Sequence, residues 1–203
     1  MSQAAEHIAL PRPVVSGTVP LEQLLAKRRS VRDYQNRAVE LADIGQLLWA
    51  AQGITHAQGY RTAPSAGALY PLELYLVAGN VAGLDDGVYH YDVVKHALTL
   101  TVKTDLRDKL ARAAYAQEWI KHAAAIVVFT GIHERSTGKY GSTGKRYVNI
   151  ETGHAAQNLF LQAEALQLAT VVVGAFNERA VTSLLQLGED STPIVLMPIG
   201  HKR

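Results

Sequence analysis

The alternation of apolar and polar residues predicts strands in the middle and at the end of the chain. Alternating segments at 72–78, 87–92 and 97–102 fit strands with one buried face, and the last two are expected to form a hairpin with a loose turn. The continuous β-rich run at 124–129 is typical of a strand that is buried on both faces. Two further strands are expected at 169–173 and 193–199.

Apolar residues at helical spacing predict helices between and around these strands. Pro20 is well placed at the start of one helix, and Gly53 ends another. The expected helices cover approximately residues 21–29, 41–51, 105–115, 148–166 and 178–187. Because helices and strands mix without a strict β-α-β alternation, the predicted fold class is α+β.

Proline and glycine mark the segments that are expected to be irregular. Residues 1–19 carry two prolines and Gly17, and they are predicted to form an N-terminal extended arm. Residues 20–203 are predicted to form a single domain, which fits a chain of 203 residues. A long loop is expected at 54–71, before the first of the alternating strands.

Composition narrows the class of protein. Hydrophobic residues make up 48% of the chain and charged residues 19%, which allows a sizeable core. A net charge of +2 gives no case for nucleic acid as the main partner, whereas a pI near 8.8 suits an anionic small ligand. The absence of cysteine excludes disulfides and thiolate chemistry and fits a reducing, cytoplasmic location. Neither a signal peptide nor an apolar run long enough to span a membrane is visible in the sequence.

The loop before the first alternating strand is the most informative segment. Small residues at Pro64–Ala68 run into Leu69, Tyr70 and Pro71. Glycine and alanine let ligand atoms approach the backbone N–H groups closely, and a proline at each end stiffens the loop. A flat cofactor commonly lies at such a loop, although a small-residue loop before a strand is more often a plain turn.

Four cations occur within the six residues from Lys27 to Arg32. Cations at the end of a helix can simply complement its dipole. They can also form a phosphate clamp, because arginine donates bidentately to phosphate and Ser30 adds a hydroxyl. Arg28 and Arg32 are four residues apart, and Arg29 and Arg32 three, so helical spacing would place two or three on one face.

The segment Gly138–Arg146 imitates a phosphate-binding P-loop but lacks two of its required residues. Lys139 stands where the first glycine is needed, and Arg146 stands where serine or threonine must bind magnesium. We therefore interpret the segment as a mobile basic loop, with Lys139 and Tyr140 as a proton-donor pair or as ordinary surface residues. No histidine pair has the helical spacing of a metal site, so no metal is expected, and His154 is interpreted as a packed or hydrogen-bonded core histidine.

Taken in order, these pieces resemble the nitroreductase family of flavoproteins and, within it, the SagB-type dehydrogenase branch. The resemblance extends from about Leu21 to the C-terminal residues. Its matching blocks are Arg28–Tyr34, Pro64–Pro71, Lys139–Gly141, Arg146–Tyr147, Gly153–Leu159, Gly174–Phe176 and Pro198–Gly200. The resemblance implies a central, mostly antiparallel sheet flanked by helices, an intertwined homodimer and one FMN at each subunit interface. It also implies NAD(P)H as the electron donor in most members.

The resemblance also implies roles for individual residues. Contacts to the phosphate, ribityl chain and pyrimidine edge of FMN are implied for Arg28, Arg29, Ser30 and Arg32. Contacts from the other subunit are implied for Pro64, Ser65, Ala66 and Leu69, and positions near the flavin ring for Gly174 and Ala175. Further phosphate contacts are implied for Lys202 and Arg203. Because a flavin performs the hydride chemistry itself, the lack of a conventional acid–base constellation is expected.

Three functions fit these observations. The leading hypothesis is an FMN-dependent oxidoreductase that transfers hydride from NAD(P)H to a nitroaromatic, quinone or related small-molecule acceptor in a ping-pong cycle. The alternative is a SagB-type azoline dehydrogenase acting on a modified peptide, in which Lys139 and Tyr140 match the Lys-Tyr pair of that branch. The third is a non-catalytic flavin-binding subunit of a larger complex.

Overall fold

The computed structural model describes residues 7–203. Seven strands form one sheet in the order β1-β6-β5-β3-β7-β9-β8, and every neighbouring pair is antiparallel. These strands are β1 (His7–Ala9), β3 (Leu72–Ala78), β5 (Gly87–Asp92), β6 (Ala97–Val102), β7 (Ala125–Ile132), β8 (Leu168–Thr170) and β9 (Ser191–His201). A separate short pair, β2 (Val39–Glu40) and β4 (Val81–Ala82), is parallel. The α+β class with a mostly antiparallel sheet is therefore confirmed.

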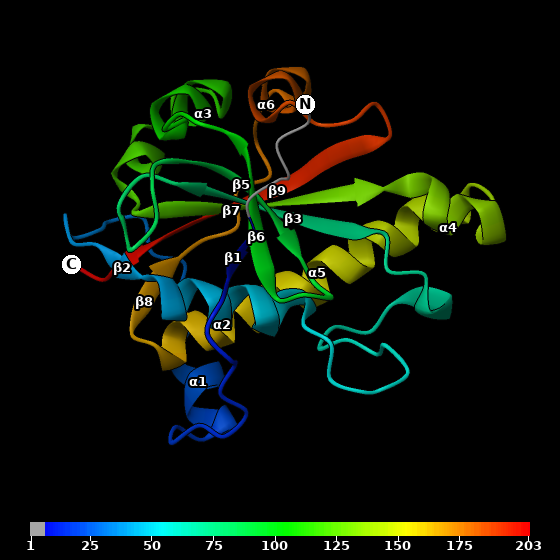
Figure 1. Cartoon of the computed structure of the whole chain (residues 1–203), viewed down its shortest axis with the longest axis horizontal. Coiled ribbons are helices and arrows are strands. Elements are labelled where there is room, and N and C mark those ends of the chain that lie inside the picture. Colours follow the sequence, from blue (N-terminus) through cyan, green and yellow to red (C-terminus); the bar gives the residue numbers. More distant parts are fainter. Residues whose placement is uncertain (1–6) are drawn as a thin grey trace.

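Helices cover both faces of the large sheet (Figure 1). On one face lie α2 and α5, and on the other lie α3 and α6. The helices are α1 (Leu21–Lys27), α2 (Leu41–Gln52), α3 (Arg107–Ala113), α4 (His133–Tyr140), α5 (Thr143–Ala165) and α6 (Glu178–Leu185), with 3-10 turns η1 (Ala66–Ala68) and η2 (Glu118–His122). No helix within residues 7–203 is both long and apolar enough to cross a membrane.

Strand β7 shows how the sheet separates two hydrophobic cores. Val127 and Phe129 belong to the core shared with α2 and α5, whereas Ile126 and Val128 belong to the core shared with α3 and α6. All four side chains are fully buried. Side chains alternate across a strand, so burial on both faces requires the unbroken apolar run that the sequence shows.

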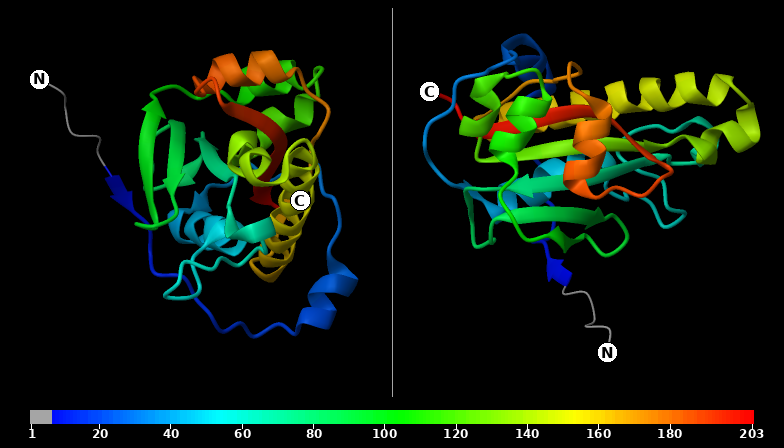
Figure 2. Two further views of the ribbon diagram at one scale, coloured as in Figure 1. Left: turned by 90° about the vertical axis from the view of Figure 1, so that its right-hand side faces the viewer. Right: turned by 90° about the horizontal axis from the view of Figure 1, so that it is seen from above.

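The N-terminal arm is only partly irregular. Residues 7–9 form an edge strand against β6, which the sequence analysis did not predict, and residues 10–20 contain neither helix nor strand. Residues 1–6 of the predicted arm lie outside the described residues. The side chain of Gln46 fixes the arm to α2, because it accepts from the Val14 N–H at 2.8 Å and donates to the Val14 carbonyl at 2.9 Å. Figure 2 shows α1, which buries none of its residues, standing away from the body of the molecule.

The prediction of a mobile basic loop at 138–146 is wrong, because most of this segment is helical. Helix α4 ends at Tyr140, and α5 begins three residues later. Gly141 closes α4 with a φ of 55°, a conformation that favours glycine. A Cβ at Gly144 would lie 2.7 Å from the backbone of Ser136, so this glycine permits close approach of α4 and α5. The glycines therefore build a tight connection between two helices.

The other predicted elements are confirmed with changes at their ends. Helix α1 stops two residues before the predicted end, and α5 begins five residues before its predicted start. Strand β8 stops at Thr170, although Val173 still forms a bridge to Leu196 of β9. Predicted ends are uncertain by a few residues because propensity changes gradually along a chain.

Candidate functional site

The basic segment 28–32 meets the C-terminal residues at one end of the sheet. The backbone N–H groups of Val31 and Gln35 donate to carbonyls of β8 and β9 at 3.0 Å. Tyr34 forms a bridge to Lys202. These contacts bring the cations of residues 28–32 to the cations of the C-terminal residues 202–203, and we call these two segments together the basic end.

Two arginines of the basic end lie over aromatic rings. The Arg28 guanidinium is 5.0 Å from the centre of the Phe160 ring on α5. The Arg32 guanidinium is 5.7 Å from the centre of the Trp119 ring. Such stacking orients an arginine without using its N–H donors. Both arginines therefore keep donors that can bind an anion.

The other three cations of the basic end, Arg29, Lys202 and Arg203, have partners within the chain. Arg29 donates to the carbonyls of Ala26 and Arg28 at 3.0 and 2.7 Å, so it closes the end of α1 as the dipole interpretation predicts. Lys202 pairs with Glu164 at 2.7 Å, and the exposed Arg203 pairs with Asp33 at 3.4 Å. Ser30 is exposed beside them.

The helical spacing argument for these arginines is wrong. Helix α1 ends at Lys27, and Arg28 already has extended backbone angles, with φ −51° and ψ 130°. Residues 28–32 are therefore not on one helical face. Pairing with β8 and β9 places them instead.

Gly174 and Ala175 present open backbone. Both residues are exposed, and a Cβ at Gly174 would meet no atom within 4 Å. The Ala175 carbonyl accepts from the Gln117 side chain at 3.1 Å, which fixes the turn after β8. A cavity of about 280 Å³ lies between α5 and β9, with Phe160 and Val172 in its wall. The cavity therefore adjoins both the Arg28 contact and the segment that leads to Gly174.

The Pro64–Pro71 loop has an unusual backbone. Gly67, Ala68 and Tyr70 have positive φ values of 65°, 53° and 46°, which side-chain-bearing residues rarely adopt. The Ser65 hydroxyl accepts from the Tyr70 N–H at 2.9 Å, and Arg135 donates to the Tyr70 carbonyl at 3.0 Å. These contacts hold the loop in a strained conformation, which is typical of functional sites.

Lys139 and Tyr140 lie against this loop, on helix α4. A Cβ at Gly67 would be 2.6 Å from the Tyr140 hydroxyl and 3.0 Å from the Lys139 ammonium nitrogen. The Tyr140 ring also packs edge-on against Tyr147 of α5, with 5.1 Å between ring centres. The structure therefore brings together two of the predicted groups, the Lys-Tyr pair and the small-residue loop. We call the loop with this pair the loop end.

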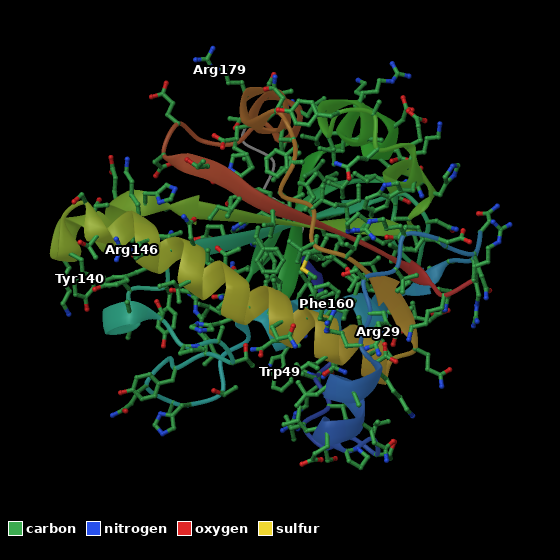
Figure 3. The ribbon with its side chains drawn as sticks, turned by 180° about the vertical axis from the view of Figure 1, so that it is seen from behind. Arg29, Trp49, Tyr140, Arg146, Phe160 and Arg179 are labelled. Atoms are coloured by element: carbon green, nitrogen blue, oxygen red, sulfur yellow. The ribbon has the colours of Figure 1, made fainter. Side chains whose placement is uncertain are left out.

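The two ends lie apart along α5 (Figure 3). Tyr140 and Arg146 are near the start of the helix, whereas Arg29 and Phe160 are near its other end. Tyr147 and Phe160 are thirteen residues apart, which corresponds to a rise of about 20 Å. Within one subunit, the basic end and the loop end therefore lie far apart along α5.

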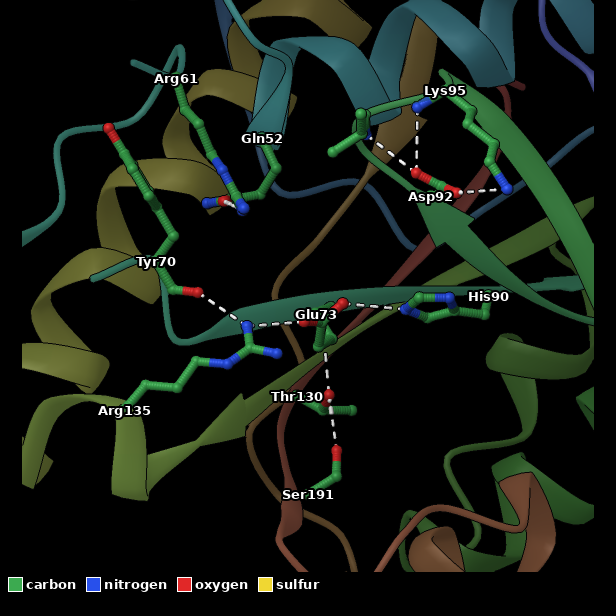
Figure 4. A network of polar contacts seen from close by, with 11 residues as sticks. Gln52, Arg61, Tyr70, Glu73, His90, Asp92, Lys95, Thr130, Arg135 and Ser191 are labelled. Carbon is green, nitrogen blue, oxygen red and sulfur yellow. Dashed lines mark hydrogen bonds and ion pairs between the residues drawn. The ribbon is translucent and has the colours of Figure 1, made fainter. Parts of the chain in front are cut away.

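A polar network behind the loop end was not predicted (Figure 4). Glu73 of β3 pairs with Arg135 at 2.7 Å and with His90 at 2.9 Å. Burial alone would raise the pKa of Glu73, but the hydrogen bonds from His90 and Arg135 hold that pKa below its ordinary value. Arg61 donates to the Gln52 side chain at 2.7 Å and lies 4.4 Å from the centre of the Tyr70 ring.

Glu151 is a second residue that the sequence analysis missed. It lies on α5 and is only 3% exposed, and its carboxyl oxygen Oε1 is buried without a hydrogen-bond partner. Burial raises the pKa of its carboxyl to about 7. A signal was present, because Glu151 and Thr152 occupy the helical spacing between the apolar residues Val148 and Ala155. An acidic residue on the apolar side of a helix is unusual, because buried carboxylates are normally paired with another polar group.

The histidine interpretation is wrong at one position. His154 is exposed rather than packed in the core, because it follows the exposed Gly153 on the open side of α5. Within residues 7–203, no group of three or more histidine, aspartate or glutamate side chains is arranged to hold a metal ion.

Comparisons with known proteins agree with this arrangement. The sequence profile of the nitroreductase family matches residues 25–201. A protein of Methanocaldococcus jannaschii named as a nitroreductase is 41% identical over 184 residues, which cover 91% of this chain and 92% of that protein. The microcin B17-processing protein McbC of Escherichia coli is 29% identical over 147 residues, which cover 69% of this chain and 54% of that protein. A crystal structure named as a nitroreductase, from Ralstonia eutropha, has a TM-score of 0.86 at 29% identity and covers 97% of this chain and 90% of its own. The chain therefore belongs to the nitroreductase family of oxidoreductases.

Proposed function

We propose that this protein is an FMN-dependent oxidoreductase that transfers hydride from NAD(P)H to a nitroaromatic, quinone or related acceptor in a ping-pong cycle. The observation that carries the proposal is the basic end, where Arg28 and Arg32 stack on aromatic rings and keep donors that can bind an anion. Membership of the nitroreductase family supports the same chemistry.

The residues at the basic end fit the chemistry of FMN. A phosphate carries a charge near −2, and it would be held by Arg28 and Arg32, with Lys202 and Arg203 nearby. The open backbone at Gly174 and Ala175 would allow a flat ring to approach closely, which a larger side chain would prevent. FMN would supply the hydride chemistry, and the protein would bind the cofactor, orient it and limit its contact with water.

We further propose that the protein works as a homodimer. Val15 of the arm is 83% exposed, Leu21 and Leu25 of α1 are 55% and 52% exposed, and Ile150 of α5 is 49% exposed. Burying such side chains at an interface would remove apolar surface from water, which favours association. A partner subunit would cover them and could bring its own loop end to the basic end, which the separation along α5 makes necessary if both contact one cofactor.

Titration with FMN tests the proposal directly. The purified protein, or its cofactor-free form with added FMN, should show the absorption bands of a bound flavin. Sedimentation of the loaded protein at micromolar concentration should give a dimer. A protein that neither carries flavin nor quenches its fluorescence on titration contradicts the proposal, and a stable flavin-loaded monomer contradicts the dimer.

The Lys-Tyr pair favours a second candidate, a SagB-type azoline dehydrogenase. Lys139 and Tyr140 contact the Pro64–Pro71 loop, and the relative McbC is named as a microcin-processing protein. Oxidation of an azoline-containing peptide, followed by mass spectrometry for the loss of two hydrogens, would support this candidate. Steady oxidation of NADH or NADPH with a small acceptor would support the first. Neither activity in a flavin-loaded protein would support a non-catalytic flavin-binding subunit.

A further inference from the structure

Beyond Pro11, the N-terminal arm is held to α2 by its main chain. Residues 14–20 are all exposed, and the side chains of Val14 and Val15 are 63% and 83% exposed. The arm runs as an extended segment from β1 to α1 (Figure 2). The Gln46 amide of α2 accepts from the Val14 N–H at 2.8 Å and donates to the Val14 carbonyl at 2.9 Å. The arm is therefore attached to α2 through the backbone of Val14.

The Gln46 amide is fixed in an orientation that suits one extended residue. A backbone N–H only donates and a carbonyl only accepts, so Oε1 faces the Val14 N–H and Nε2 faces the Val14 carbonyl. Nε2 also donates to Oε1 of Gln162 on α5 at 3.1 Å. Because Gln46 is only 9% exposed, its amide needs protein partners in place of water. A ligand that replaces the arm must therefore supply an N–H and a carbonyl with the spacing of one extended residue.

A cavity of about 650 Å³ adjoins this contact, between the arm, α1, α2 and α5. Three helices contribute apolar side chains to its wall, namely Leu24, Trp49, Leu161 and Leu166. Val14 and Val15 border the cavity but remain mostly exposed, so the arm leaves it unfilled. A chain bound at Gln46 with a larger apolar side chain would bury more surface here than the arm does.

We propose that Gln46 and this cavity form a recognition site for an extended peptide, and that the arm occupies the Gln46 contact until such a peptide replaces it. The backbone of the peptide would pair with the Gln46 amide as Val14 does, and an apolar side chain beside that residue would enter the cavity. Backbone pairing combined with a side-chain pocket is a common mode of peptide recognition. The inference goes beyond the proposed function, because it involves neither FMN nor a hydride acceptor.

A synthetic peptide with the sequence of residues 12–19 tests the proposal in the full-length protein. Val14→Pro in the protein removes the arm N–H that donates to Gln46, so the arm should no longer compete for that contact. This variant should bind the peptide about tenfold more tightly than the parent does, as measured by calorimetric titration. Val15→Pro is the matched control, because Val15 is exposed and the Gln46 contact is to Val14. It should bind the peptide as the parent does.

Two altered peptides test the chemistry of recognition. N-methylation at the residue that matches Val14 removes the N–H donor and should weaken binding to the Val14→Pro protein about tenfold. Phenylalanine in place of the residue that matches Val15 adds apolar surface and should strengthen binding about five-fold. Adding Gln46→Ala to Val14→Pro should abolish the difference between methylated and unmethylated peptides. If that double variant does not fold, the comparison of the two peptides on Val14→Pro alone decides.

Three outcomes overturn the proposal. The first is equal binding of methylated and unmethylated peptides by Val14→Pro, or no binding of either at millimolar concentration. The second is peptide binding that leaves the Val14 amide of the parent as protected from hydrogen exchange as before, because the peptide then lies elsewhere. The third is a parent dimer that dissociates in Val14→Pro, because the occupant is then the arm of a second copy.

FMN titration of the same proteins separates this inference from the proposed function. Val14→Pro should bind FMN as the parent does. Peptide binding by a protein that takes up no FMN would retain the peptide site and overturn the proposed function. FMN uptake without peptide binding would retain the proposed function and overturn the peptide site.

Discussion

The basic end and the loop end are built in different ways. At the basic end, exposed and partly exposed cations are brought together by backbone pairing between segments far apart in the chain, as between Tyr34 and Lys202. At the loop end, the Ser65 hydroxyl and the Arg135 guanidinium hold the Tyr70 backbone in a strained conformation. The basic end is therefore suited to bind an anion through its charges, whereas the loop end is suited to position a ligand through its fixed backbone conformation.

The largest effect is expected when the Lys-Tyr pair of the loop end is changed. If the pair serves the substrate, Lys139→Ala and Tyr140→Phe should slow turnover of the electron acceptor, or of an azoline donor, by about 10² to 10⁴. Flavin reduction and FMN content should remain close to those of the parent. Stopped-flow measurement of the reductive and oxidative half-reactions separates these steps.

The melting temperature provides the control for this pair. Lys139 is exposed, and Tyr140→Phe removes only a hydroxyl, so stability should change little. If both variants turn over every tested substrate at the parental rate, Lys139 and Tyr140 only pack against Gly67. The loop end would then contribute no group to the chemical step.

At the basic end, a smaller effect on binding is expected. Arg28→Ala or Arg32→Ala should raise the dissociation constant of FMN about ten- to a hundred-fold, the range for loss of a charge-assisted hydrogen bond. Fluorescence titration of the cofactor-free protein measures this. Arg179→Ala, on an exposed position of α6 (Figure 3), is the matched control for loss of one positive charge and should bind FMN as the parent does.

Arg29→Ala distinguishes the two interpretations of the cation cluster. Its guanidinium closes α1 through two carbonyls, so helix closure alone predicts a loss of stability below about 1 kcal/mol and unchanged FMN affinity. A loss of affinity equal to that of Arg28→Ala would show that Arg29 changes partner when FMN binds. Unchanged affinity in Arg28→Ala and Arg32→Ala together would count against the phosphate clamp.

These two regions also show how far the sequence alone leads. The clustered cations and the small-residue loop were visible as patterns, because a phosphate site needs charge and a close approach needs small side chains. The strands were predictable because burial on one or two faces leaves a periodic pattern, as in β7. Glycine content at 138–146 was misleading, because Gly141 and Gly144 serve a helix end and a close contact rather than flexibility.

What the sequence could not supply was long-range pairing. Helical spacing suggested that two or three of Arg28, Arg29 and Arg32 share one face, but the pairing of Val31 with Thr170 and of Tyr34 with Lys202 determines their place. Likewise, the partner of Glu73 is Arg135, 62 residues away in the sequence. Local propensity is a weak guide where tertiary contacts decide.

Gly67 tests whether the loop end depends on backbone conformation. With φ at 65° and the Lys-Tyr pair beside it, Gly67→Ala should lower the free energy of unfolding by about 1–3 kcal/mol. Gly59→Ala is the matched control, because Gly59 also has a positive φ, of 84°, but a Cβ there meets no atom within 4 Å. Denaturant unfolding of both variants separates strain from contact. An equal loss in both would mean that Lys139 and Tyr140 move away without cost.

An effect of the opposite sign, a gain in stability, is expected from Glu151→Gln. Burial raises the pKa of Glu151 from its ordinary 4.5 to about 7 in the folded state. As the pH rises from 4.5 to 7, the unfolded chain loses this proton while the folded protein keeps it, so folding stability falls across that window. Below pH 4.5 the Glu151 carboxyl is neutral in both states and does not change the free energy of unfolding. Above pH 7 it is charged in both states, and the loss of folding stability stays constant.

Glutamine cannot titrate, so the variant should escape this cost. The full shift from 4.5 to about 7 corresponds to roughly 3.4 kcal/mol, and solvent screening near the loop reduces the expected value to about 1–2 kcal/mol. Relative to the parent, Glu151→Gln should therefore gain about 1–2 kcal/mol in free energy of unfolding between about pH 4.5 and pH 8. Urea unfolding at both pH values measures this change. A difference between variant and parent that does not vary with pH would mean that the Glu151 carboxyl ionises as it does in water, and that the loop end, like the basic end, is open to solvent.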